Sequence, residues 1–198
     1  MVSLLLLVST FLVGPAEQKD VENEIVGIRR EFKTIQSQLS EFKRHQRVLL
    51  GISAEGASIT AYRDGEKVRK ITVEALGETG KYLAEFFYND EKLFFAFMQV
   101  IDYGGHIMET LEGKKLKNDV REEDRLYFVK DDLVRWLRFK KQIPPPNPDF
   151  AQKRKSVLAQ AQSFLLLMKT PAPKKGEDTC DWNCGKQEHD HCVKYVCD

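Results

Sequence analysis

Three segments between residues 58 and 139 repeat one pattern, in which apolar β-type runs flank a short polar turn. They read SITAYRDGEKVRKITVEA, KYLAEFFYNDEKLFFAFMQVI and RLYFVKDDLVRWLRF. Each copy has an aromatic residue before the turn and a Val or Leu after it, and the turns are predicted at Asp64-Gly65, Asn89-Asp90 and Lys130-Asp131. This pattern is typical of β-hairpins. Three hairpins predict an antiparallel sheet of about six strands.

The hairpins resemble the short aromatic-Asx-Gly-Lys hairpins of MORN-type proteins, which build open single-layer sheets. The resemblance covers a few residues in each copy, and the copies lack the strict period of that family. It therefore implies an open sheet, and no function is carried over from it.

The middle of this region is apolar on both alternating sets of residues. One set consists of Leu93, Phe95 and Phe97, and the other of Phe94, Ala96, Met98 and Val100. A strand with two apolar faces is normally central and covered on both sides. Two helical segments are the candidate covers, and a face left open would be a binding surface.

Residues 17–50 are predicted to form one long helix. Its apolar residues alternate in spacing between four and three, at Val21, Ile25, Ile28, Phe32, Ile35, Leu39 and Phe42. This heptad stripe has two interpretations: a coiled coil with a second copy through residues 21–42, or packing on the sheet of the same chain. Phe at two stripe positions favours the sheet, because aromatic rings pack poorly in a two-stranded seam.

A second helix is predicted over residues 149–169. Its apolar residues recur at helical spacing, at Val157, Leu158, Ala161, Phe164, Leu165 and Met168. A proline-rich linker, residues 141–148, precedes this helix, and Pro171 and Pro173 end it. This helix is the candidate cover for the second face of the sheet.

The order of a long helix and then an antiparallel meander is similar to cystatin-like folds. The inhibitory motif of that family is Gln-x-Val-x-Gly, whereas residues 46–51 read Gln-Arg-Val-Leu-Leu-Gly, with one residue too many. The similarity therefore implies an architecture and no inhibitory function.

The first sixteen residues have the composition of a cleaved secretory signal. Residues 2–13 are apolar apart from two serines and a threonine, and Gly14-Pro15-Ala16 supplies small residues for cleavage. This run is too short to span a bilayer as a permanent helix. No Lys or Arg precedes it, so an uncleaved anchor is the alternative. We expect a secreted or periplasmic protein without a permanent transmembrane segment.

The tail, residues 171–198, contains every cysteine of the chain: Cys180, Cys184, Cys192 and Cys197. In an oxidising compartment they predict two disulfides, which can pair in three ways. A zinc site is the alternative, formed by the four thiolates or by thiolates together with the imidazoles of His189 and His191. The loop between the two inner cysteines is shorter than the usual separation of zinc knuckles. We therefore expect a disulfide-bonded tail and no metal or other cofactor.

The chain has 31 basic and 30 acidic residues, so no overall field favours nucleic acid. A local excess of positive charge brackets the linker. We call it the basic set, and it consists of Arg135, Arg138, Lys140, Lys141, Lys153, Arg154 and Lys155. This set predicts either a binding surface for an anionic surface or acidic partner, or a solvated face.

No catalytic residue is assigned, because the Gly-x-Ser-x-Gly, His-Glu-x-x-His and P-loop motifs are absent. His106 lies in the loop DYGGHIMET, where Asp102 or Glu109 is close enough in sequence to orient its imidazole. A hydrolase-type role for His106 is therefore the enzymatic alternative. The carboxylates of residues 122–124 indicate a solvated approach to a strand.

These patterns predict an α+β protein. A long N-terminal helix packs on the hairpin sheet within residues 17–140, and the second helix (149–170) and the cysteine-rich tail follow. We expect an exported, non-catalytic binding protein that recognises a protein partner or a cell-envelope component through the basic set and the tail. A structural role through oligomerisation of the first helix is the alternative from another class.

Overall fold

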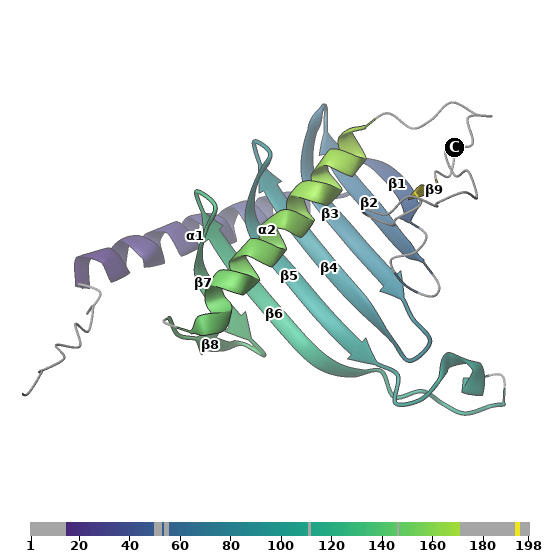
Figure 1. Ribbon diagram of the computed structural model, residues 1–198. Coiled ribbons are helices and arrows are strands. Elements are labelled where there is room, and N and C mark those ends of the chain that lie inside the picture. Colours follow the sequence, from purple (N-terminus) through teal and green to yellow (C-terminus); the bar gives the residue numbers. More distant parts are fainter. Residues whose placement is uncertain are drawn as a thin grey trace, which may run out of the picture.

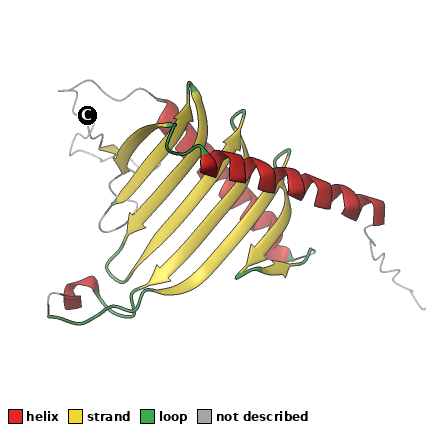
Figure 2. Cartoon of the chain, turned by 180° about the vertical axis from the view of Figure 1, so that it is seen from behind, coloured by secondary structure: helices red, strands yellow, loops and turns green. Residues whose placement is uncertain are grey.

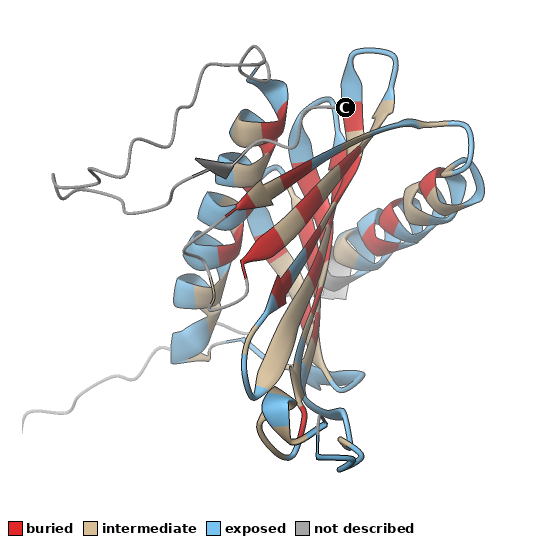
Figure 3. Cartoon of the chain, turned by 90° about the vertical axis from the view of Figure 1, so that its right-hand side faces the viewer, coloured by how far each residue is buried: buried red, intermediate tan, exposed pale blue. Residues whose placement is uncertain are grey.

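The computed structural model describes residues 15–49, 53, 56–110, 112–145, 147–170 and 193–194. In these residues, one antiparallel sheet lies between helix α1 (Pro15–Ser37) and helix α2 (Pro148–Lys169), which cross opposite faces (Figures 1 and 2). Seen along the sheet, the buried residues lie between the two helices (Figure 3). This arrangement confirms an α+β fold. Residues 1–14 of the predicted signal and all four cysteines lie outside the described residues.

The sheet is a meander in the order β8-β7-β6-β5-β4-β3-β2-β1-β9. The six predicted strands are all present as β2 (Ala57–Asp64), β3 (Lys67–Leu76), β4 (Gly80–Asn89), β5 (Lys92–Asp102), β6 (Asp119–Val129) and β7 (Asp132–Arg138). The prediction missed β1 (Lys43–Leu49), β8 (Lys141–Ile143) and the two-residue β9 (Val193–Lys194). A short 3₁₀ helix, η1 (Ile107–Thr110), lies between β5 and β6. Strand β8 uses the first three residues of the predicted linker.

The three predicted hairpins share a β-bulge at the same place. In each second strand one residue is left out of the pairing register: Arg69 in β3, Phe94 in β5 and Val134 in β7. A bulge places two successive residues on one side of a sheet. Phe94 and Phe95 therefore both face α1, whereas Leu93 lies in the cluster under α2. The prediction that Phe94 shares a face with Ala96 was wrong for this reason.

Helix α1 is shorter than predicted, but its stripe packs as expected on the sheet of the same chain. All seven stripe residues belong to one apolar cluster with Phe87, Phe95 and Tyr127. The helix ends at Ser37, and residues 38–42 form a turn whose Leu39 and Phe42 still reach this cluster. Residues 43–49 form β1 instead of a last helical segment, because they pair in full register with β2.

Helix α2 confirms the predicted cover of the second face. Asn147 caps its first turn by accepting a hydrogen bond from the Asp149 amide at 2.8 Å. Val157, Ala161, Leu165 and Met168 are buried against the sheet. Helix α2 crosses the strands diagonally (Figure 1), so part of the sheet beside it is left uncovered.

Candidate ligand groove beside helix α2

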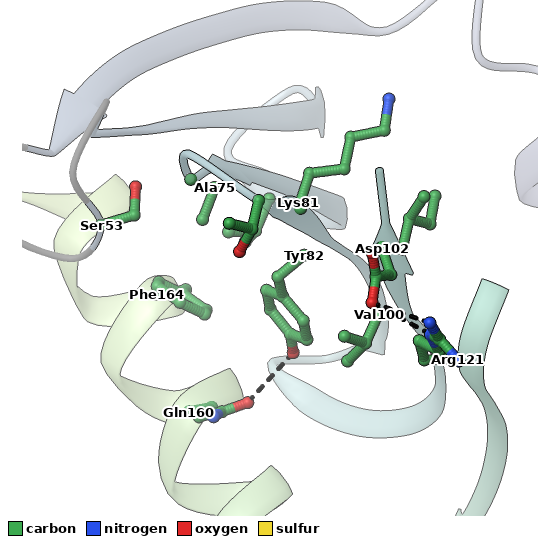
Figure 4. A pocket seen from close by; sticks show the side chains of 14 residues that line it. Ser53, Ala75, Lys81, Tyr82, Val100, Asp102, Arg121, Gln160 and Phe164 are labelled. Carbon is green, nitrogen blue, oxygen red and sulfur yellow. Dashed lines mark hydrogen bonds and ion pairs between the residues drawn. The ribbon is translucent and has the colours of Figure 1, made fainter. Parts of the chain in front are cut away.

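A groove of about 570 Å³ runs between α2 and the adjoining ends of β3, β4 and β5 (Figure 4). Apolar side chains from the three strands and from α2 form its walls: Val73, Ala75, Tyr82, Val100 and Phe164. We call this the Tyr82 groove. Val100 is 41% exposed although it is a large apolar residue in a central strand. Ligand sites of small molecules have volumes and linings of this kind.

At the start of β4, beside the groove, the chain approaches itself closely. A Cβ atom on Gly80 would lie 2.4 Å from the carbonyl oxygen of Ile101, so only glycine fits opposite β5 here. Strand alternation then directs Val73 and Ala75 of β3 toward α2. Because Ala75 is small, the space beneath Phe164 stays open.

Two polar pairs border the apolar walls. The Tyr82 hydroxyl donates to the Gln160 Oε1 atom of α2 at 3.4 Å. Burial, with a smaller contribution from the charge of Asp124, raises the pKa of Tyr82, so this phenol stays protonated. At the rim, Arg121 donates to Asp102 at 3.0 Å (Figure 4). The Gly104 amide and then Arg121 hold the pKa of Asp102 below its usual range, against the effect of desolvation.

A buried carboxylate fixes the first half of α2, and hence one wall of the groove. Asp124 of β6 is 2% exposed and accepts hydrogen bonds from Trp136 Nε1 and Arg138 Nε, both at 2.9 Å. Lys153 of α2 lies 2.6 Å from its second oxygen. Burial raises the pKa of Asp124, but these three donors outweigh it, so the pKa lies below its usual value. The prediction that residues 122–124 are all solvated was wrong for Asp124.

Two further hydrogen bonds fix the rest of α2. The buried Tyr88 hydroxyl donates to the Ala161 carbonyl at 2.8 Å. Arg47 of β1 donates to the carbonyl oxygens of Leu167 and Thr170, which are unsatisfied within the helix end. The guanidinium of Arg47 also complements the negative end of the helix dipole.

The structure divides the basic set between the two faces. Arg135 pairs with Glu22 of α1, whereas Arg138 and Lys153 bind Asp124 on the other side. Arg154 pairs with Asp132 at 2.9 Å. In the described part of the chain, three members of the set have no ion pair and are exposed: Lys140, Lys141 and Lys155. The set is therefore not one continuous strip.

His106 lies in the connection before η1, and its imidazole contacts Glu78 at 3.1 Å. Glu109 accepts from the backbone amide of His106 and not from its ring, and Asp102 binds Arg121 instead. Neither predicted carboxylate therefore orients this imidazole. Within the described residues, no three His, Cys, Asp or Glu side chains are arranged to hold a metal ion. Neither described helix combines the length and apolar character needed to cross a membrane.

Sequence reasoning did not identify the Tyr82 groove, although two of its signals were visible. Val100 and Phe164 both belonged to predicted apolar patterns. These two side chains line an open space only because α2 crosses the sheet diagonally. No sequence pattern pointed to Tyr82 or Gln160 as members of a site.

Comparisons with known proteins found no matching family model, no similar curated protein and no similar solved structure.

Proposed function

We propose that this chain is an exported, non-catalytic binding protein that holds an apolar component of the cell envelope in the Tyr82 groove. The observation that carries the proposal is the groove itself: a volume of about 570 Å³ with apolar walls and polar pairs only at its borders. Such a lining takes up apolar ligand surface, and a few fixed polar groups orient it.

The chemistry of the groove supports binding more than catalysis. Among the described residues that line it, there is no histidine or cysteine. Ser53, which lines the groove, donates its hydroxyl hydrogen to the Gly56 carbonyl at 2.7 Å, so it is not activated by a base. His106, the enzymatic alternative, is not among the lining residues.

The Tyr82 groove is also a better candidate for the binding site than the basic set is. Four of the seven basic residues are paired within the protein, so their charges are largely neutralised. The three exposed lysines remain available for weak attraction to an anionic surface.

Fluorescence titration with N-phenyl-1-naphthylamine, an apolar probe, tests the proposal. Val100→Asp places a charge in the groove wall and should weaken probe binding roughly tenfold, because an unpaired carboxylate disfavours apolar contact. Val120→Asp is the matched control, since Val120 is also 41% exposed but does not line the groove. Equal binding by the two variants, or no binding by the native chain, would refute the groove as the site.

A further inference from the structure

The charged side chains that line the Tyr82 groove are all paired. Three of the described lining residues carry a charge at neutral pH: Lys81, Asp102 and Arg121. The ammonium of Lys81 lies 3.8 Å from Glu74 Oε1, and Figure 4 shows its side chain extending away from the Tyr82 hydroxyl. Arg121 binds Asp102, so each positive charge of the lining has a carboxylate beside it. These pairs therefore present no net charge to a ligand.

The pair at the rim is held on both oxygens of its carboxylate. Asp102 Oδ1 accepts from the Gly104 amide at 2.6 Å, and Oδ2 accepts from Arg121 Nε and lies 3.0 Å from Arg121 Nη2. An anionic head group that approaches Arg121 meets the charge of Asp102, and a cationic head group that approaches Asp102 meets the charge of Arg121. Neither kind of ion finds a free counterion here.

Uncharged polar atoms of the lining are available to a ligand. The Tyr82 hydroxyl donates to Gln160 Oε1 at 3.4 Å, and its oxygen can still accept a hydrogen bond. Gln160 is exposed, and its Nε2 group has no hydrogen-bond partner in the part of the chain that the structure describes. A hydroxyl or amide head group can accept from Gln160 and donate to Tyr82 at the same time.

We propose that the Tyr82 groove selects an uncharged amphiphile: its apolar chain lies along the groove walls, its hydroxyl or amide head binds Gln160 and Tyr82, and the Asp102–Arg121 pair disfavours ionic heads. This inference rests on the proposed function and names the class of ligand. A charged head would leave water without gaining a free counterion, which is costly. A hydroxyl or amide loses less on leaving water and regains hydrogen bonds from the two side chains. A penalty on competing ligands is one way in which a site becomes specific.

Competition for the fluorescent probe N-phenyl-1-naphthylamine tests this selectivity. The competitors are decan-1-ol, decanoate and decylammonium at pH 7, which share one chain length and differ in the charge of the head group. With the native chain, decan-1-ol should displace the probe at the lowest concentration. The two ions should act within roughly twofold of each other, because the paired charges favour neither sign. Since decan-1-ol is also the most apolar competitor, variants are needed to separate charge from apolar character.

Breaking the ion pair from either side should create a preference for one sign of charge. Asp102→Asn leaves the guanidinium of Arg121 unpaired and should improve competition by decanoate roughly tenfold. Arg121→Gln leaves the Asp102 carboxylate without its cation and should improve competition by decylammonium by a similar factor. Competition by decan-1-ol should be the same in both variants as in the native chain. Asp64→Asn is the matched control, because it removes a carboxylate that is exposed at the end of β2 and does not line the groove.

The contacts of the head group have their own test. Gln160→Leu removes the free amide and keeps an apolar side chain at this position. It should weaken competition by decan-1-ol roughly fivefold, while binding of the probe itself stays within about twofold of the native value. Unchanged competition by decan-1-ol would overturn the assigned position of the head group.

The outcomes separate this inference from the proposed function. No probe binding by the native chain, or equal binding by Val100→Asp and Val120→Asp, would refute the groove itself. If the probe binds in the groove but the native chain prefers one ion by more than roughly tenfold, the selection against charge is overturned while the groove stands. The same conclusion follows if neither Asp102→Asn nor Arg121→Gln changes the ratio of the two ions.

Discussion

Helices α1 and α2 are attached to the same sheet by different chemistry. Under α1, the Phe32 ring lies 4.9 Å from the Phe87 ring and 5.3 Å from the Phe95 ring, measured between centroids. Helix α1 also forms the ion pairs Glu22–Arg135 and Glu31–Arg69 with the sheet, but these leave their carboxylates one-half and one-third exposed. In addition, Lys70 donates to Gln36 of α1 at 3.3 Å. Helix α2 also buries apolar residues, but polar contacts with the sheet fix it at its start, middle and end.

The difference indicates what each attachment can specify. Apolar contact is non-directional, so the aromatic cluster stabilises α1 without fixing one exact position along the sheet. Buried hydrogen bonds are directional and costly to break, so they specify one position. The Tyr82 groove exists only where α2 lies in that position. A helix that forms the wall of a binding groove therefore needs directional hydrogen bonds to the sheet, whereas a helix that only covers the sheet does not.

The largest effect is expected from removing the centre of the aromatic cluster. Phe87 is 0% exposed, and Phe87→Ala should lower the free energy of unfolding by about 4 kcal/mol, the range for large-to-small changes in a core. Urea denaturation measures this loss, with Phe139→Ala at an exposed turn as the control. Below the transition, probe binding in the groove should be unchanged. Weaker probe binding in the still-folded variant would mean that the two faces are coupled.

The next largest effect is expected from Asp124, where probe binding should change together with the free energy of unfolding. Asp124→Asn removes the charge that pairs Lys153 and Arg138, and should cost about 3 kcal/mol at pH 7. It should also weaken probe binding, because α2 is released from its position. Asp132→Asn is the control, since Asp132 pairs with Arg154 of α2 at an exposed site. Unchanged probe binding would show that apolar contacts alone position α2.

The same variant makes the pH dependence testable. The pKa of Asp124 is lower in the folded protein than its usual value of 3.8. The stabilisation by this carboxylate is therefore complete above about pH 4 and is lost as the pH falls through the folded pKa. The difference between the native chain and Asp124→Asn in urea midpoint should be constant from pH 7 to 5 and shrink toward pH 3. A constant difference at pH 3 would contradict the role of the charge.

The features predicted correctly from sequence are those that depend on local periodicity. The heptad stripe, the three hairpins and the spacing of Val157 and Ala161 are each visible within a short window. Residues 43–49 were misassigned because Phe42 continued the stripe, whereas strand pairing with β2 decides their conformation. Phe94 was misplaced because a bulge resets the alternation, and no residue in that run marks it.

The candidate site was missed for a different reason. Asp124, which positions α2, is flanked in sequence by charged residues and so resembles a solvated residue. Only the fold brings Trp136, Arg138 and Lys153 around it. The basic set likewise looked continuous along the chain, but alternation on β7 sends Arg135 and Arg138 to opposite faces. A charge pattern cannot show which members will be neutralised by residues distant in sequence.

The smallest effect is expected at the ion pair that joins α1 to the sheet. Glu22 is half-exposed, so when Glu22→Gln removes its charge, water can solvate the Arg135 guanidinium in its place. The urea midpoint should therefore stay within experimental error of the native value, at low and at high salt. Glu22–Arg135 and Asp124–Lys153 both join a helix to the sheet, so the two variants compare the same kind of link at an exposed and a buried site. A midpoint change for Glu22→Gln approaching that of Asp124→Asn would mean that α1, too, is positioned by charge.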